Sequence, residues 1–189
     1  MSWNDVVGEA RKTEKVPYSK FDAGNTMIRI IDNEPYSFWT HWLEKQKTSA
    51  TCMGRDCPMC AVNAQMKANK EAPKYGNSQR HAVRIWNHDT QQMEIMIQGK
   101  TFFSQLLTLH KEVGDITTYD IKVVRKGAGT DTTYTLLPQP PKDLEVPEGA
   151  ITDVDFESTF SPPTKEEMIL LMEGKTWAEI NGVNEGDVA

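Results

Sequence analysis

All three cysteines of this 189-residue chain lie within nine residues, as Cys52, Cys57 and Cys60 in a C-x4-C-x2-C pattern. Three thiols cannot pair as disulfides without leaving one over. Gly54 accepts a positive φ and Pro58 fixes φ, so the chain can turn back and bring the sulfurs together. The pattern predicts a tetrahedral Zn²⁺ site of the Cys₃His kind. The alternatives are ordinary reduced thiols or a redox centre.

The fourth ligand of this site is predicted from the position of the histidines. His41 lies eleven residues before Cys52, at the end of an aromatic run that resembles a strand. His81, His88, His110 or a water molecule are the alternatives. The choice matters, because a water ligand would indicate a catalytic metal, whereas four protein ligands indicate a structural one.

Charge is distributed unevenly along the chain. Residues 143–189 hold twelve acidic residues and two lysines, a net charge of −10, whereas residues 1–142 carry a net charge of +4. A mildly basic body can attract polyanions that an acidic tail repels or mimics, although such a tail can also serve solubility alone. With no signal peptide or membrane-length apolar run, we expect a reducing intracellular compartment and no membrane partner.

The order of short apolar segments predicts a mainly β protein. Strands are expected at 26–31, 36–43, 79–87, 93–97, 119–126 and 132–137, and helices at 58–70, 101–112 and 165–174. This order suits an OB-fold-like Greek-key barrel of five or six antiparallel strands, with an inserted zinc-binding loop and helix and one helix before the last hairpin. We predict an N-terminal arm (1–25), this domain (26–140), and an acidic C-terminal tail (141–189) with a short amphipathic helix.

A barrel of this kind has a groove across its sheet, which can bind single-stranded nucleic acid if cations follow the phosphates and rings stack on the bases. Two arginines and a tryptophan share one face of the strand at 79–87. Each ring could instead belong to the core, and each basic side chain could simply be solvated. The candidate contacts are Arg29, Trp39, Tyr75, Arg80, Arg84, Trp86, Lys122, Arg125, Lys126 and Tyr134.

Four runs of sequence carry a resemblance to a known family. They are W-T-H-W-L-E with the cysteine pattern after it, R-H-A-V-R-I-W-N, G-K-T-F-F-S-Q-L-L, and Y-D-I-K-V-V-R-K-G-A-G-T-D-T-T-Y-T-L-L-P. Over about residues 20–140 the chain resembles bacteriophage single-stranded DNA-binding proteins, of the zinc-containing, OB-fold, helix-destabilising kind.

The resemblance implies one structural zinc ion, bound by His41, Cys52, Cys57 and Cys60. It also implies sequence-independent binding of single-stranded DNA during phage DNA replication, recombination and repair, in the cytoplasm of the infected host. The acidic tail would recruit replication and recombination proteins and temper DNA binding. The basic N-terminal arm of the family is weak here, so only weak self-association on DNA is expected.

Enzymatic alternatives fit the sequence poorly. Zinc nucleobase deaminases use H-x-E with P-C-x-x-C, whereas Glu44 here gives H-x-x-E and Pro58 lies inside the C-x-x-C. Nucleases need clustered carboxylates, and most acidic residues lie in the tail. We therefore expect a protein that is not an enzyme, with an RNA-binding zinc module or a protein-binding adaptor as the alternatives.

Overall fold

The computed structural model describes residues 16–182, which form one antiparallel sheet of seven strands with several helices. None of the helices in this range is long and apolar enough to cross a bilayer. The strands are β1 (Gly24–Ile30), β2 (Tyr36–Leu43), β3 (Thr48–Thr51), β4 (Gly76–Asn87), β5 (Gln92–Gly99), β6 (Tyr119–Lys126) and β7 (Thr133–Pro141); the helices are α1 (Pro58–Ala68), α2 (Lys100–Val113), α3 (Phe156–Thr159), α4 (Lys165–Glu173) and α5 (Trp177–Ile180).

The sheet is organised around β4. Its order is β3-β2-β4-β1-β6-β7, and β5 pairs with the other edge of β4. β2 and β1 follow one another along a single edge of β4, with Tyr36 opposite Ala82 and Ile30 opposite Ile85. At the break between them, the Asp32 carboxylate accepts the backbone N–H of Arg84 at 2.6 Å. This side chain therefore replaces the hydrogen bond that the sheet loses where the edge is interrupted.

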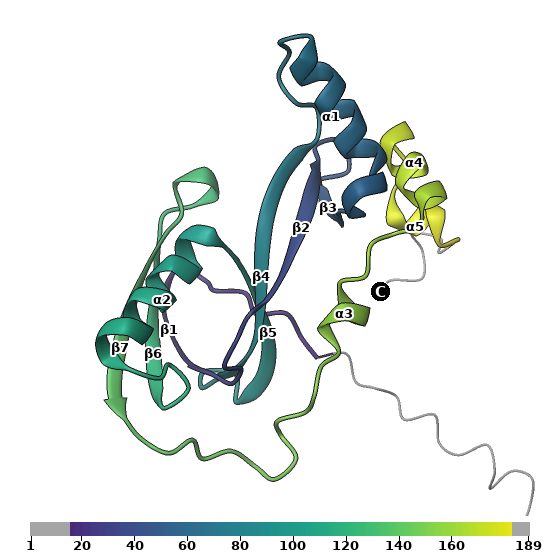
Figure 1. The fold of residues 1–189 in the computed structure, drawn as a ribbon. Helices are drawn as coiled ribbons and strands as arrows, with labels where there is room; N and C mark the ends of the chain where they lie inside the picture. The colour runs from purple at the N-terminus through teal and green to yellow at the C-terminus, as the bar shows by residue number, and fades with distance from the viewer. Residues whose placement is uncertain (1–15, 183–189) are drawn as a thin grey trace, which may run out of the picture.

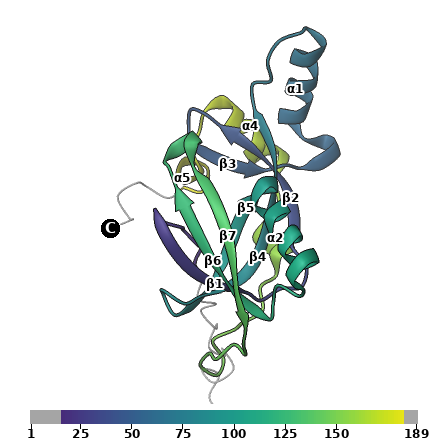
Figure 2. The ribbon, with the colours of Figure 1, turned by 90° about the vertical axis from the view of Figure 1, so that its left-hand side faces the viewer.

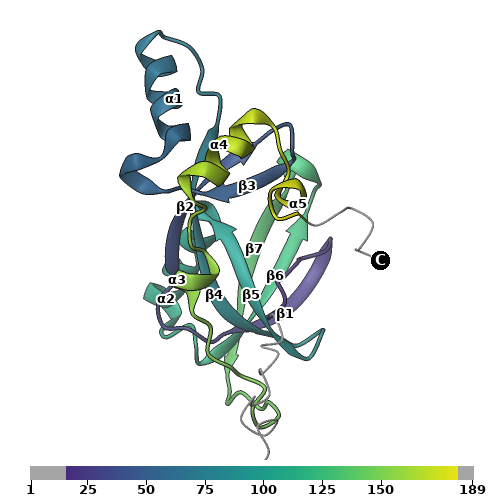
Figure 3. The same ribbon diagram turned by 90° about the vertical axis from the view of Figure 1, so that its right-hand side faces the viewer.

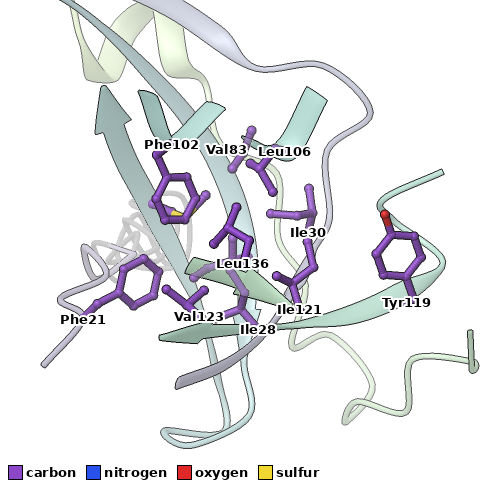
Figure 4. Close-up of a cluster of buried hydrophobic side chains, with 12 residues drawn as sticks. Phe21, Ile28, Ile30, Val83, Phe102, Leu106, Tyr119, Ile121, Val123 and Leu136 are labelled. Carbon is purple, nitrogen blue, oxygen red and sulfur yellow. The ribbon is translucent and has the colours of Figure 1, made fainter. Parts of the chain in front are cut away.

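The main core lies between the inner face of the curved sheet and helix α2. Because side chains alternate along a strand, one face of β1, β4 and β6 supplies apolar residues to this core. α2 adds Phe102 and Leu106, four residues apart on one face of the helix. The buried side chains of this core come from separate elements (Figure 4), and they are Phe21, Ile28, Ile30, Val83, Ile85, Met96, Phe102, Leu106, Tyr119, Ile121, Val123 and Leu136.

β2 and β4 extend beyond this core and, with β3 and α1, form a projecting metal lobe (residues 41–76) (Figures 1 and 2). The C-terminal helices pack on this lobe. Met168 and Leu171 of α4 are almost fully buried against Leu43 and Met59. The Gln46 amide donates to the carbonyl oxygen of Leu171 at 2.7 Å.

The mainly β, antiparallel architecture predicted from the sequence is confirmed, and so are the hairpins and the helix before the last one. β3 was not predicted, because its four residues T-S-A-T are too few for a recognisable alternation. The tail predicted to begin at residue 141 is not separate from the domain, since parts of it pack against the sheet and the metal lobe.

The predicted N-terminal arm (1–25) is described only from residue 16 onward. Residues 1–15, with the basic cluster Arg11, Lys12 and Lys15, lie outside the described residues. The described part is attached to the domain. Phe21 belongs to the main core, and the backbone N–H of Ser19 donates to the carbonyl of Ile95 at 2.9 Å.

Candidate metal centre and nucleic-acid interface

The four predicted metal ligands come together. One ligand atom from each of His41, Cys52, Cys57 and Cys60 lies within 4.8 Å of all the others. His41 Nε2 is 3.4 Å from the Sγ atoms of both Cys57 and Cys60, and the Sγ atoms of Cys52 and Cys60 are 3.6 Å apart. A tetrahedral zinc ion at about 2.3 Å from sulfur keeps its sulfur ligands roughly 3.8 Å apart. The donor atoms therefore have the spacing that one metal ion requires.

Local structure explains why these side chains meet. His41 lies on β2 opposite Ala50 of β3, and it is fully buried. A short 3₁₀ turn, Gly54–Asp56, begins at a glycine with φ of 77° and returns the chain toward β2. Cys57 is the N-cap of α1, so Cys60 follows one helical turn later on the same side.

The protonation states of His41 and Cys57 favour metal binding. Burial lowers the pKa of His41, although the backbone of Gly76 and Tyr75 partly offsets it, so the imidazole is neutral at pH 7. Burial also opposes ionisation of Cys57, but backbone groups of Cys60, Met53 and Met59 outweigh it and lower the pKa of this thiol.

The other two thiols are hard to ionise without a cation. Burial raises the pKa of Cys52, and burial with the neighbouring Cys52 and Cys57 raises the pKa of Cys60 to about 12. A bound cation would instead lower the pKa of both thiols, because it stabilises thiolates directly. Four protein ligands enclosed by apolar side chains fit a closed site for a single ion.

Three of the predicted DNA contacts are buried, so they cannot meet a strand in this structure. Arg29 is 2 % exposed, Tyr75 6 % and Trp86 1 %. Arg29 is bound to the carboxylate of Asp120, and the backbone of Tyr75 is held by the amide of Asn63. These three side chains therefore belong to the interior of the fold and form no accessible surface for DNA in this structure.

Two further candidates have other partners within the chain. Arg84 donates to Asp32 and Asp153, at 2.8 and 3.0 Å. Tyr134 packs edge-on against Phe102 in the main core, with ring centroids 5.4 Å apart. Five candidates keep accessible surface: Trp39 on β2, Arg80 on β4, and Lys122, Arg125 and Lys126 on β6. β1 separates β6 from β4 in the sheet, so these residues do not form one cluster.

The Trp86→Ala variant is expected to lose about 3–5 kcal/mol of unfolding free energy, as is usual for truncating a buried aromatic side chain. Trp39→Ala is the matched control, because Trp39 is 49 % exposed. We expect the control to change stability by no more than about 0.5 kcal/mol. Chemical denaturation measures both variants, and a Trp86→Ala protein as stable as the wild type would show that the ring is not part of the core.

The sequence did not predict an aromatic platform on the outer face of the sheet. Tyr36 and Phe38 of β2 lie opposite Ala82 and Arg80 of β4, and because opposite residues share a face, all four lie together with Arg84. The period-two spacing of Tyr36 and Phe38 was visible in the sequence. The segment that packs on these rings could not be identified from the sequence.

A segment from the predicted tail lies over this platform, and we call it the covering segment (residues 152–160). Figure 3 shows it running along the sheet beside β2 and β4 toward α4. The Phe160 ring stacks on Phe38, with centroids 4.3 Å apart and an interplanar angle of 12°, and Phe156 stacks on Tyr36 at 5.9 Å. Arg84 Nη1 donates to the carbonyl of Thr152 at 2.8 Å, beside its ion pair with Asp153.

The covering segment therefore presents one carboxylate, Asp153, to Arg84 and two flat rings, Phe156 and Phe160, to the rings of Tyr36 and Phe38. Its sequence, T-D-V-D-F-E-S-T-F, places two phenylalanines four residues apart among three acidic side chains. That spacing was the only signal in the sequence for this contact. The metal centre and this covered platform are the two features of residues 16–182 from which the function is proposed below. No family model matches the chain, and neither does any curated protein or any solved structure.

Proposed function

We propose that this chain is a sequence-independent single-stranded DNA-binding protein of OB type, without catalytic activity and with one structural zinc ion. The observation that carries the proposal is the covering segment on the aromatic platform. Stacked rings beside a carboxylate–arginine pair provide the same contacts as stacked bases beside a phosphate–arginine pair. We therefore propose that the surface that binds the covering segment also binds a DNA strand.

The strand pairing supports an OB-type barrel. An OB fold has five strands, with a helix between the third and the fourth. If β1 and β2 count together as the first strand, then β4, β5, β6 and β7 are the other four, and α2 is the helix. The pairings are those expected of that fold, except that β5 and β7 do not pair among the described residues. OB modules bind oligonucleotides on the face of their second and third strands and through two loops. Here those strands correspond to β4 and β5, and the loops to the metal lobe and the β6–β7 hairpin.

Zinc is the metal we propose, because Cys₃His is a common structural zinc set and no ligand position is left for water. The four donors would hold the metal lobe at one end of the platform. His41 and the three cysteines would bind the ion, and it would take no part in chemistry.

In this proposal, DNA and the covering segment compete for Tyr36, Phe38, Arg80 and Arg84. The protein would coat template and displaced strands in phage replication, recombination and repair, and a displaced covering segment would become available to partner proteins. Binding is expected to weaken steeply with salt, because each phosphate contact releases bound cations and this release becomes less favourable as the salt concentration rises.

The test is a variant with a weakened covering segment, Asp153→Ala/Phe160→Ala. It is expected to bind oligo-dT about tenfold more tightly than the wild type, because one stacked ring and one arginine contact no longer compete with the DNA. The matched control is Glu166→Ala/Ile169→Ala, which removes the same kinds of side chain from exposed positions of α4. Fluorescence anisotropy with labelled oligo-dT at two salt concentrations measures both variants.

Three outcomes would count against this proposal. The first is no binding of oligo-dT by either the wild type or the weakened variant. The second is tighter binding of a duplex than of the single strand, and the third is equal tightening by the control. A titration with oligo-U separates a preference for RNA, since only RNA carries the 2′-hydroxyl.

A further inference from the structure

The opposite face of the same strands lines a cavity that the proposed function does not use. Its volume is about 380 Å³, and it lies between α2, β4 and the break between β1 and β2. Buried core side chains form its floor, among them Ile30 and Val83, and Phe103 and Leu107 of α2 form one wall. Leu107 is 53 % exposed. Cavities of a few hundred Å³ with apolar walls and a few polar groups are typical of small-molecule sites.

Hydrogen-bonding groups surround the opening of this cavity. Ser37 Oγ and His81 Nδ1 are 2.7 Å apart, and the His81 ring lies beside Phe103, with centroids 4.9 Å apart. Burial lowers the pKa of His81, so its ring is neutral at pH 7 and Nε2 keeps one hydrogen-bonding position. The side chains of Gln79 and Lys100 also line the cavity, and neither makes a hydrogen bond or ion pair within residues 16–182.

The charge of the lining favours an anion. Asp32 is the one acidic residue that lines the cavity in the described part of the chain. Its carboxylate accepts from the guanidinium of Arg84 at 2.7 and 2.8 Å, so its charge is already compensated. The ammonium of Lys100 remains, with no acidic partner among the described residues.

We propose that this cavity binds a nucleotide. The base would pack against Phe103 and His81 and use the amide of Gln79 for its hydrogen-bonding edge, while Lys100 would bind the phosphate. Trp39 lies directly opposite Gln79 on the neighbouring strand and is half-exposed, so a second base could stack beside the opening. The ligand is either a free nucleotide or one nucleotide of a strand, since both offer a base and a phosphate.

This proposal does not depend on the function proposed above. The cavity lies on the face of β4 that carries His81 and Val83, whereas the covering segment lies on the face that carries Ala82 and Arg84. A nucleotide can therefore enter while the covering segment stays in place.

The experiment is isothermal titration calorimetry of the full chain with dAMP, deoxyadenosine and oligo-dA. Lys100→Ala is expected to weaken dAMP binding about tenfold and to leave deoxyadenosine unchanged, because it removes a contact to a charged group. Gln79→Ala is expected to weaken the binding of all three ligands about fivefold. Lys111→Ala is the matched control, since Lys111 is an exposed lysine of α2 that does not line the cavity.

The two sources of the nucleotide give different results. Binding of dAMP itself, weakened by Lys100→Ala, supports a site for free nucleotides. If only oligo-dA binds, and both Lys100→Ala and Gln79→Ala weaken it while Lys111→Ala does not, the site holds one nucleotide of a strand. The proposal is overturned if no ligand binds, or if neither cavity variant affects binding. The Asp153→Ala/Phe160→Ala variant should change oligonucleotide binding and leave dAMP binding unchanged, so a failure here is distinct from a failure of the proposed function.

Discussion

Chelation of the proposed zinc ion is expected to unfold the metal lobe (residues 41–76) while the main core stays folded. Structural zinc sites contribute on the order of 10 kcal/mol to folding, which far exceeds what the few buried side chains of a lobe this small can replace. The Cys57→Ser variant should have the same effect, because it removes one of the four donor side chains. Serine suits the N-cap position of α1 that Cys57 occupies, so loss of a helix cap would not be the cause.

The unfolding should spread to the C-terminal helices. Met168 and Leu171 of α4 are buried on the lobe, beside Cys57 and Met59. Without the metal they lose their packing partners, so α4 and α5 should come free and the covering segment should lose its C-terminal attachment. Hydrogen exchange measured with and without chelator tests this. Fast exchange is expected over residues 41–76 and 165–180, and slow exchange over β1, β5 and β6.

The Arg55→Ala variant is the control for the metal site, because Arg55 is exposed and lies between two of the ligands without being one. Its exchange and its metal content should match those of the wild type. If chelator leaves exchange over residues 41–76 unchanged, the lobe does not depend on a metal ion, and the four side chains form only a cluster of thiols and an imidazole.

Asp120→Ala is expected to destabilise the fold by about 3–5 kcal/mol, which is the usual effect of leaving a buried charge without its partner. The carboxylate of Asp120 is 3 % exposed and accepts from Arg29, His88 and Lys142, at 2.9, 3.0 and 2.8 Å. Asp120 of β6 is thereby connected to Arg29 of β1, to His88 just after β4, and to Lys142 just after β7. Removing the carboxylate leaves the guanidinium of Arg29 buried with two backbone carbonyls as its remaining partners.

The same carboxylate makes stability depend on pH. Burial opposes the ionisation of Asp120, but the hydrogen bonds from Lys142 and His88 and the charge of Arg29 outweigh it and hold its pKa below the ordinary value. The Asp120 carboxylate therefore makes its full contribution to the free energy of unfolding above the unfolded-state pKa, which is about 4. This contribution is lost as the pH falls through the lower folded-state pKa. The wild type should lose stability over that acidic range, and Asp120→Ala should lose less.

Two controls identify the buried pair as the cause. Glu44→Ala removes a carboxylate from the exposed ion pair with Lys47 and should leave stability nearly unchanged. The double variant Arg29→Leu/Asp120→Leu should be more stable than Asp120→Ala, because it removes both buried charges. Urea unfolding at neutral and acidic pH measures all four proteins. If Asp120→Ala and Glu44→Ala had equal effects, the ion pair with Arg29 would contribute little to the fold.

The local pattern of the sequence was sufficient to predict the cluster of His41 with the three cysteines and most of the strands. Cys52, Cys57 and Cys60 are close in the chain, and the turn residues between them leave few ways to arrange three sulfurs. His41 could be chosen because it lies eleven residues before Cys52, at the end of an aromatic run that resembles a strand. Hairpins such as β6–β7 are also local, since both strands and the turn are contiguous.

The sequence alone determined which residues share a face of a strand, because alternation is a property of the backbone. Which face is covered, and by what, was decided only by tertiary contacts between segments far apart in the chain. Arg29 and Trp86 looked like groove residues, yet Asp120 and the surrounding packing bury them. The same limit explains why the covered platform was missed: Phe160 stacks on Phe38 from a segment more than a hundred residues away. Burial depends on the sum of such distant contacts, so a one-dimensional pattern does not contain it.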